Sequence, residues 1–332
     1  MDLAVVIINY RTPKLVIDSL QSLQPQIDSS RHKVMLVDND SGDDSLPILE
    51  QAIKEYQWES WVTLIPSPVN GGFSAGNNVG IKAITAKAYL LLNSDTILRP
   101  GAIASLETAL EKHPEAGLIS PRLEWPDETP QISCFRYHSP ISQFIDGAAT
   151  GPITKLLDAY NVPIPVQNTP FRPQWTSFAC VLIRQEVIEQ IGLMDEGYFM
   201  YFDDVDYCHS AKNAGWNILH WPYARVVHLR RGSGSVKSDV KARKRPRSYL
   251  YASRSRYFAK FYGIFGLWLA NICWLLGRSI AWIRELINNK QPHTCEYQEQ
   301  DIWMNWKEPL QLPILPPSSY EKNSLILLLL VP

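Results

Sequence analysis

An apolar run that ends in polar residues is the part of this chain best placed to do chemistry. Residues 88–92 read AYLLL, and Asn93, Ser94 and Asp95 follow directly. A buried strand that delivers a carboxylate at its C-terminal end is where an open α/β sheet places its ligand site. On an extended segment Asn93 and Asp95 point the same way, so both side chains could face one divalent cation. The alternative is that Asp95 caps the following turn, and this stretch alone does not separate the two interpretations.

A second group of acids, Asp203, Asp204 and Asp206, opens a segment that we expect to be helical over 201–216. The helix dipole stabilises carboxylates at this end, but the three groups also repel one another. Repulsion raises the proton affinity of at least one of them, which suits a general base. The alternative interpretation is a solvated helix N-terminus with no chemical role.

Three weaker signals accompany these acids. The loop NGGFSAG (70–76) follows a strand and precedes a helix, which suits close approach to a phosphate or ribose. It lacks the Gly-Lys-Ser/Thr of a P-loop and the G-x-G-x-x-G spacing, so a tight turn into a helix is an equal alternative. Asp38 ends a strand where a parallel sheet can bind a nucleoside, although an isolated aspartate more often caps a helix. His228 follows an apolar strand and, taken alone, would more often be structural than a ligand.

The elements that must position these residues alternate along the first 120 residues. Apolar strands are expected over 3–10, 33–40, 62–67 and 88–94, with helical patterns between them. Strands separated by helices predict an α/β fold with a doubly wound, mostly parallel sheet. Residues 121–175 are rich in proline and are interpreted as loops, a lid or an acceptor-side insertion. A strand and a short helix are expected over 177–192, and one or two strands over 217–235 that end in a glycine-serine loop.

The overall composition is typical of a folded soluble protein. The chain has 332 residues, of which 45% are hydrophobic and 20% charged. Its five cysteines are dispersed without C-x-x-C spacing, which argues against a disulfide framework or a zinc site and favours a reducing compartment. The first apolar run, residues 3–8, is too short for a signal peptide and lacks a basic leader. We therefore expect a cytoplasmic protein.

Taken in order, the motifs resemble those of inverting family 2 glycosyltransferases, nearest in pattern to bacterial rhamnosyltransferase-like members. That family has the GT-A nucleotide-diphospho-sugar transferase fold, and the resemblance covers about residues 1–260. Each motif alone is weak, but six of them occur in the expected order. They are IINYR (7–11), VDND (37–40), NGGFSAGNNVG (70–80), LLNSD (91–95), FDDVD (202–206) and VVH (226–228).

The resemblance implies a role for each matching position. Asp204 would be the catalytic base, with Asp203 and Asp206 as candidate supporting acids. Asp95 would hold Mg²⁺ or Mn²⁺ against the donor diphosphate, with His228 as a second protein ligand. One departure is that asparagine stands at the first position of the family's D-x-D motif, which removes a negative charge from the metal site. The nucleotide-sugar-binding residues would be Asn9, Tyr10, Asp38, Asn70, Gly71, Gly72, Asn77 and Asn93.

The reaction that the resemblance implies is transfer of a sugar from a nucleoside-diphosphate donor, such as dTDP-rhamnose or a UDP-sugar. The acceptor would be a hydroxyl of a glycan or lipid-linked saccharide in cell-surface polysaccharide synthesis, and no nucleic acid partner is expected. A cation neutralises the leaving diphosphate while a carboxylate activates the hydroxyl, so one displacement inverts the anomeric carbon. Two alternatives are a non-catalytic sugar-nucleotide-binding protein of the same fold and a nicotinamide-dependent dehydrogenase. The missing G-x-G-x-x-G counts against the dehydrogenase.

The C-terminal third differs in composition from the rest. Between Arg225 and Lys260 there are twelve Lys or Arg residues and a single acid, and 261–277 then has no charge. We expect a C-terminal helical, membrane-associating extension to the catalytic domain. The expected division is a catalytic domain over 1–250 (nucleotide-sugar binding in 1–120, acceptor side and base in 121–250), a basic and apolar helical segment over 251–290 and a tail over 291–332.

Three interpretations of residues 261–277 remain open. They are a buried helix packed on the catalytic domain, a membrane-spanning helix, and a helix lying in the membrane interface at the inner face of the plasma membrane. A span is disfavoured because the run is short and holds Asn271 and three glycines. In the interfacial interpretation Trp268, Trp274 and Trp282 lie at headgroup depth. The neighbouring bases would be attracted to anionic lipid by roughly 1 kcal/mol each, which suits a lipid-linked acceptor.

Overall fold

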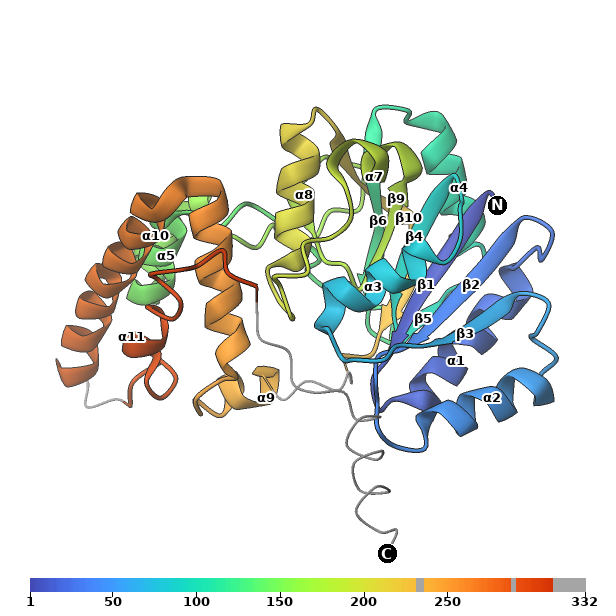
Figure 1. The fold of residues 1–332 in the computed structure, drawn as a ribbon. Coiled ribbons are helices and arrows are strands. Elements are labelled where there is room, and N and C mark those ends of the chain that lie inside the picture. Colours follow the sequence, from blue (N-terminus) through green and yellow to red (C-terminus); the bar gives the residue numbers. More distant parts are fainter. Residues whose placement is uncertain (231–235, 288–290, 313–332) are drawn as a thin grey trace, which may run out of the picture.

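The computed structural model describes residues 1–230, 236–287 and 291–312. Within them, a sheet with helices on both faces forms the main body, and a helical lobe lies beside it (Figure 1). The glycine-serine loop expected at 232–235 lies outside the described residues, as does the part of the expected tail from 313 to 332.

The main sheet has eight strands in the order β3-β2-β1-β4-β9-β6-β10-β5. Only β9 and β5 run antiparallel to their neighbours, so the prediction of a mostly parallel sheet is confirmed. The four strands expected in the first 95 residues are all present. The strands are β1 (Leu3–Asn9), β2 (His32–Asp38), β3 (Val62–Pro66), β4 (Ala88–Asn93), β5 (Thr96–Leu98), β6 (Ala116–Glu124), β9 (Cys180–Arg184) and β10 (Asn217–His228).

Both faces of the sheet are buried, as a doubly wound fold requires. In β1, Leu3, Val5 and Ile7 pack into one hydrophobic core and Ala4 and Val6 into the other, because successive side chains of a strand point to opposite faces. Helices α1 (Pro13–Leu23), α2 (Ser45–Glu55) and α4 (Ala102–Lys112) cover the first face. Helices α3 (Gly72–Lys82), α7 (Gln185–Ile191) and α8 (Asp203–Asn213) cover the second.

The proline-rich stretch 121–175 contains more regular structure than its sequence predicts, so the interpretation as loops is wrong for part of it. After β6 come helices α5 (Pro140–Ala148) and α6 (Gly151–Leu156), together with the short paired strands β7 (Cys134–Phe135) and β8 (Trp175–Thr176). Helix α5 begins with a capping box in which Ser139 Oγ accepts a hydrogen bond from the Ser142 amide at 3.2 Å. A helix of about two turns has too few apolar positions to show a clear period.

The helical lobe is built around α10 (Ser248–Ile287), which folds back on itself at Gly263 (φ 70°, ψ 177°). This break separates a first arm, 248–262, from a second arm, 264–287, and α5 packs against α10 in the same lobe (Figure 1). The two helices cross closely, since a Cβ added at Gly147 would lie 2.2 Å from the Trp274 carbonyl oxygen. Two short helices, α9 (Val236–Lys241) and α11 (Gln298–Asp301), flank α10.

The lobe corrects two expectations about membrane contact. Trp274 is 3% exposed, so its expected place at headgroup depth is wrong, whereas Trp268 and Trp282 are exposed. Arg254 and Arg256 are buried rather than available to lipid. Helix α10 turns these residues inward because the face that packs on α5 and on the main body includes them.

Candidate active site

The ends of β1 and β2 place Asn9 and Asp38 side by side at the carboxyl edge of the sheet. Asn9 Nδ2 donates a hydrogen bond to Asp38 Oδ1 at 2.7 Å. Asp38, only 1% exposed, also accepts from the hydroxyl and the amide of Ser41 at 2.6 and 3.2 Å. Tyr10 is half-buried beside them, with the Arg11 guanidinium 5.1 Å from its ring centroid. The structure brings these residues together, and their contact with a nucleoside stays a prediction.

The conformation of the glycine loop requires glycine at two positions. Gly72 has a φ of +84°, and a Cβ there would lie 2.0 Å from the Phe199 carbonyl oxygen. A Cβ at Gly71 would similarly lie 2.5 Å from the Ala75 side chain. Asn70 Oδ1 shapes the turn by accepting a hydrogen bond from the Gly72 amide at 3.0 Å. The loop therefore packs tightly against the segment that leads into α8.

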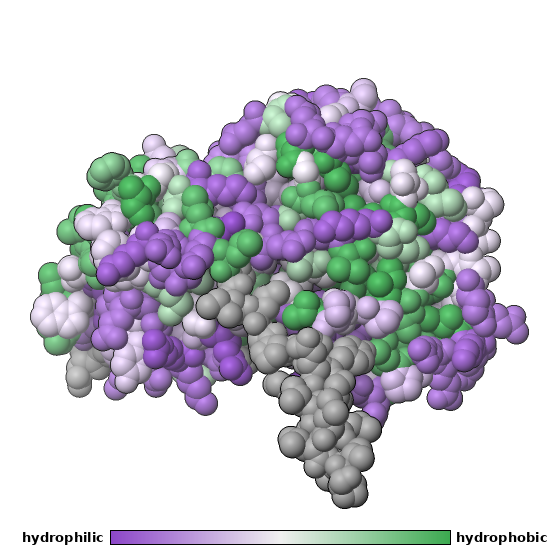
Figure 2. Space-filling view, in the orientation of Figure 1, coloured by the Kyte–Doolittle hydropathy of each residue, from purple (hydrophilic) through white to green (hydrophobic). Residues whose placement is uncertain are grey.

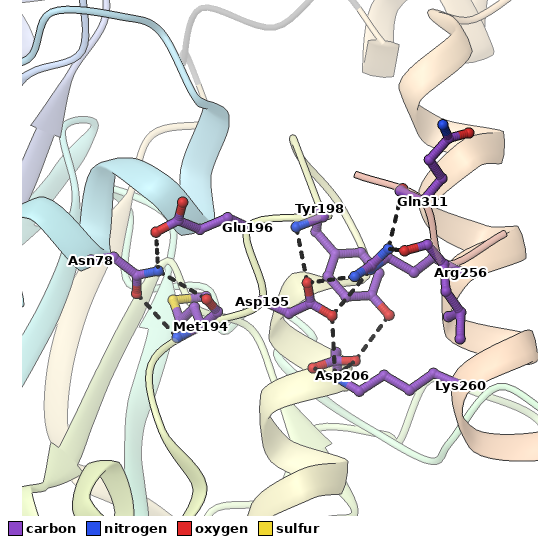
Figure 3. A network of polar contacts seen from close by, with 11 residues as sticks. Asn78, Met194, Asp195, Glu196, Tyr198, Asp206, Arg256, Lys260 and Gln311 are labelled. Atoms are coloured by element: carbon purple, nitrogen blue, oxygen red, sulfur yellow. Dashed lines mark hydrogen bonds and ion pairs between the residues drawn. The ribbon is translucent and has the colours of Figure 1, made fainter. Parts of the chain in front are cut away.

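Two adjacent asparagines of α3 have different environments. Asn77, 1% exposed, donates a hydrogen bond to the Phe73 carbonyl within its own helix at 3.0 Å. Asn78 instead bonds both main-chain groups of Met194, at 2.8 and 3.0 Å, and the Glu196 carboxylate at 2.9 Å (Figure 3). Asn78 lies inside the 70–80 motif, but nothing in its residue type or spacing indicated these partners. The hydrogen bonds of Asn78 connect α3 to the loop that precedes α8.

The turn after β4 brings a carboxylate and an imidazole together. β4 ends at Asn93 and the chain turns at Ser94 and Asp95, so the expected extended geometry that aligned Asn93 with Asp95 is wrong. Asp95 is 3% exposed, and its Oδ1 lies 3.5 Å from His228 Nε2. His228 reaches this point because β10 pairs antiparallel with β5, which places it opposite Thr96.

Asp204 lies in the first turn of α8, close to the end of β4. The Asn93 amide donates to the Ala179 carbonyl at 3.0 Å, and the neighbouring Phe178 backbone hydrogen-bonds the Asp204 carboxyl group. Burial raises the pKa of Asp204 to about 7, although main-chain hydrogen bonds, including that of Val205, act in the opposite direction. A carboxyl group with this pKa can accept a proton from a hydroxyl near neutral pH.

The other two acids of the cluster are more enclosed. Burial raises the pKa of Asp203 well above its usual range, and the charge of Asp204 adds to the effect. Asp206 accepts a hydrogen bond from the Tyr198 hydroxyl at 2.9 Å, and its carboxylate lies 2.8 Å from Lys260 Nζ (Figure 3). Burial also raises the pKa of Asp206, while Lys260 opposes the shift. Burial, rather than the expected mutual repulsion, is thus the largest cause of the raised pKa values in this cluster.

A second ion pair connects the loop before α8 to α10. Arg256 contacts both oxygens of Asp195, the closer at 2.8 Å, and also donates to the Leu310 carbonyl at 2.7 Å (Figure 3). Lys260 lies 3.3 Å from Asp195 as well. From sequence, both bases belonged to a run interpreted as lipid-facing, and nothing in their spacing indicated these partners.

A comparison with known families agrees with this geometry. The profile of the family described as "Glycosyltransferase like family 2" matches residues 2–249. The chain belongs to this family. Among its relatives, the N-acetylglucosaminyl-diphospho-decaprenol L-rhamnosyltransferase of Mycobacterium tuberculosis is 28% identical over 270 residues, 75% of this chain and 80% of that protein. The low-salt glycan biosynthesis hexosyltransferase Agl10 of Haloferax volcanii is 25% identical over 240 residues, 68% of this chain and 67% of that protein.

Solved structures identify the fold of this family 2 glycosyltransferase as GT-A. It is similar to GalNAc-T7 with UDP, GalNAc and Mn²⁺ (TM-score 0.58, 14% identity), covering 94% of this chain and 58% of that chain. It is also similar to the mannosyltransferase PcManGT from Pyrobaculum calidifontis with GDP-Man and Mn²⁺ (TM-score 0.56, 13% identity), covering 97% of this chain and 86% of that chain.

The chemistry of Asp95 and His228 fits a divalent cation. A carboxylate and an imidazole 3.5 Å apart are ligands that Mn²⁺ accepts, and a carboxylate also suits Mg²⁺. Among the described residues, no group of three or more His, Cys, Asp or Glu side chains could hold a metal. A cation here would therefore need further oxygen ligands from a diphosphate and water.

Proposed function

We propose that this glycosyltransferase moves a sugar from a nucleoside-diphosphate donor to a hydroxyl group, with inversion at the anomeric carbon. The proposal depends above all on the Asp204 carboxyl group, whose pKa is raised to about 7 beside the end of β4. The Asp95–His228 pair lies just beyond the same strand. A proton acceptor and a cation site at one sheet edge are what a single displacement on a sugar diphosphate requires.

In the proposed mechanism Asp204 accepts the proton of the acceptor hydroxyl, whose oxygen bonds to the anomeric carbon as the bond to the diphosphate breaks. Asp95 and His228 would hold Mg²⁺ or Mn²⁺, which when bound would neutralise the charge of the leaving diphosphate. No side-chain nucleophile is needed, so inversion follows from the single step. The donor's base, ribose and sugar would lie against Asn9, Tyr10, Asp38, Asn70, Gly71, Gly72, Asn77 and Asn93.

The two named relatives support a choice of substrates. One carries L-rhamnosyltransferase and a diphospho-decaprenol acceptor in its name, and the other belongs to glycan biosynthesis. We therefore propose dTDP-rhamnose or a UDP-sugar as donor and a glycan or lipid-linked saccharide as acceptor, in cell-surface polysaccharide synthesis. In terms of domains, 1–250 would hold the catalytic machinery, with the donor in 1–120 and the acceptor in 121–250. The segment 251–290 would contact a membrane.

Donor binding should be visible as stabilisation of the folded protein. With Mn²⁺ present, the correct nucleotide sugar should raise the unfolding temperature, because a ligand that binds only the native state stabilises it. A screen of dTDP-, UDP- and GDP-sugars by thermal shift would identify it, and NMR of the product would report the anomeric configuration. Retention of configuration would contradict the proposed mechanism. Donor binding without transfer to any acceptor would favour the alternative of a non-catalytic binding protein.

The second arm of α10 supports a peripheral membrane contact. Apolar side chains gather at the outer edge of the helical lobe (Figure 2). Among them, the side chain of Phe265 is 87% exposed. The opposite face is buried and carries Asn271 and the ion pair between Arg278 and Glu285, so lipid could not surround this helix. The helix is long and apolar enough to span by composition, yet this packing favours the interfacial interpretation. The exposed apolar stripe is Phe265, Leu269, Ile272, Leu276, Ile283 and Ile287.

Positive charge lies near the end of this arm. Lys241, Arg243 and Lys244 are exposed, and Arg243 donates to the Pro292 carbonyl just beyond the arm, at 2.6 Å. Anionic headgroups attract such bases, and the attraction falls with added salt. We propose that α10 rests on the inner face of the plasma membrane, where a lipid-linked acceptor would be presented.

Substitutions in the apolar stripe should abolish binding to vesicles. A variant with Phe265→Ser, Leu269→Ser and Leu276→Ser should stay in the supernatant when phosphatidylglycerol vesicles are sedimented at low salt, while the parent protein sediments. Truncation at Lys260 is a poor test because it would remove the partner of α5. A matched control replaces exposed Ile48 and Tyr223, which lie on the catalytic domain. If the parent protein itself stays in the supernatant, the membrane proposal is wrong.

A further inference from the structure

Gln131 connects three parts of the chain that are distant in sequence. It lies in the segment after β6, and it is 6% exposed. Its side-chain Nε2 donates hydrogen bonds to the carbonyl oxygens of Glu124 at 3.1 Å and His228 at 2.8 Å. Its Oε1 accepts a hydrogen bond from Arg230 Nε at 2.6 Å. Because β6 ends at Glu124 and β10 at His228, the amide joins the carboxyl ends of two neighbouring parallel strands.

The residues that Gln131 holds lie beside the candidate cation site. The His228 imidazole lies 3.5 Å from the Asp95 carboxylate, and the next amide, that of Leu229, donates to the Asp95 carbonyl at 2.9 Å. Arg230 then has a φ of 54°, a conformation uncommon for residues other than glycine. Its guanidinium lies 5.7 Å from the Trp125 ring centroid. Partial burial lowers the pKa of Arg230, and the nearby Asp95 charge opposes this shift.

We propose that Gln131 is a positioning residue for donor binding. It fixes the end of β10 and orients the Arg230 guanidinium toward the place where the donor diphosphate would bind beside Asp95. The inference rests on the proposed function, because it requires a diphosphate at this site. An arginine that is already ordered loses less conformational entropy when it binds an anion, so affinity rises without any contact between Gln131 and the ligand.

The side-chain amide is the chemical group that this place requires. The two strand-end carbonyls need two donor hydrogens, and Arg230 Nε needs an acceptor. A single primary amide supplies all three. Methionine has a similar length but would leave both carbonyls and the guanidinium without these bonds. Glutamate would keep the acceptor for Arg230 and lose the donors. The two substitutions therefore separate the role of the arginine contact from that of the strand ends.

A matched glutamine in the helical lobe provides the control. Gln143 is 5% exposed, accepts a hydrogen bond from Arg254 Nε at 2.8 Å and donates to Asp146 Oδ2 at 3.2 Å. It thus repeats the contact between a buried glutamine and an arginine away from the strand ends of the catalytic domain. If Gln131 were purely structural, Gln131→Met and Gln143→Met should lower the unfolding temperature similarly and leave nucleotide binding alone.

The test is calorimetric titration of the full-length protein with UDP, dTDP and GDP in the presence of Mn²⁺. Gln131→Met should weaken binding of the preferred nucleotide about tenfold, the scale of one hydrogen bond to a charged group. Gln143→Met should bind as the parent does. In an Arg230→Ala background, Gln131→Met should cause little further loss, because its effect passes through the arginine.

The outcomes separate this inference from the proposed function. If the parent protein binds none of the three nucleotides with Mn²⁺, both are overturned. If the parent binds but Gln131→Met binds equally well, only the positioning role is overturned. If Gln131→Met does not fold, Gln131→Glu serves in its place and should keep binding within about threefold of the parent, since it retains the arginine contact. A loss with Gln131→Glu as large as that with Arg230→Ala would also count against the inference.

Discussion

Replacing Asp204 with asparagine is expected to lower the turnover number at least about a hundredfold, the usual scale of general-base catalysis. Asparagine keeps the shape of the side chain but cannot accept the hydroxyl proton. The Kd for the donor should change little, because the proposed donor contacts lie elsewhere. The measurement is kcat and donor affinity for the two proteins under the same conditions.

The pH profile provides a second readout of the same residue. Burial raises the pKa of Asp204 to about 7, and a base acts only when ionised. In the parent protein kcat should therefore rise as pH increases through about 7 and level off above it, and this rise should be absent in Asp204→Asn.

A nearby variant distinguishes loss of chemistry from loss of structure. Asp206→Asn removes a buried carboxylate that lies 2.8 Å from Lys260, so it should chiefly lower the unfolding temperature. Asp204→Asn should not, because a neutral side chain suits a buried position at least as well as an ionised one. Near-normal turnover by Asp204→Asn would exclude it as the base and direct attention to Asp203.

Replacing Asp95 with alanine should weaken donor binding only when the divalent cation is present. The carboxylate would hold the cation, and the cation and the diphosphate bind as a unit. Calorimetry with and without Mn²⁺ measures the difference. Excess EDTA should abolish transfer by the parent protein, and His228→Ala should have a milder effect of the same kind.

The control for this experiment is an aspartate that lies away from the site. Asp18 is exposed on α1, and Asp18→Ala should bind the donor and respond to Mn²⁺ as the parent does. Full activity of the parent in excess EDTA would show that the cation is dispensable. Cationic side chains would then have to neutralise the leaving diphosphate.

Sequence patterns were sufficient to predict the donor-side half of the fold. The apolar strands at 3–10 and 88–94 and the glycine loop at 70–76 follow from local periods and turn residues, which depend on near neighbours in the chain. The order of the motifs also indicated the family, which the match over residues 2–249 confirms. Helix α5 was missed because its stability depends on packing against α10 rather than on its own nine residues.

Only the tertiary structure decided which polar residues meet. His228 reaches Asp95 through the antiparallel pairing of β10 with β5, and Lys260 reaches Asp206 because α10 lies against α8. These pairs are far apart in sequence, so no local pattern specifies them. Burial likewise depends on the whole fold: it raises the pKa of Asp204, and it places Trp274 inside the helical lobe while leaving Trp268 at its surface. The sequence specifies the type of each residue, but the elements that pack around a residue determine its partners and its exposure to water.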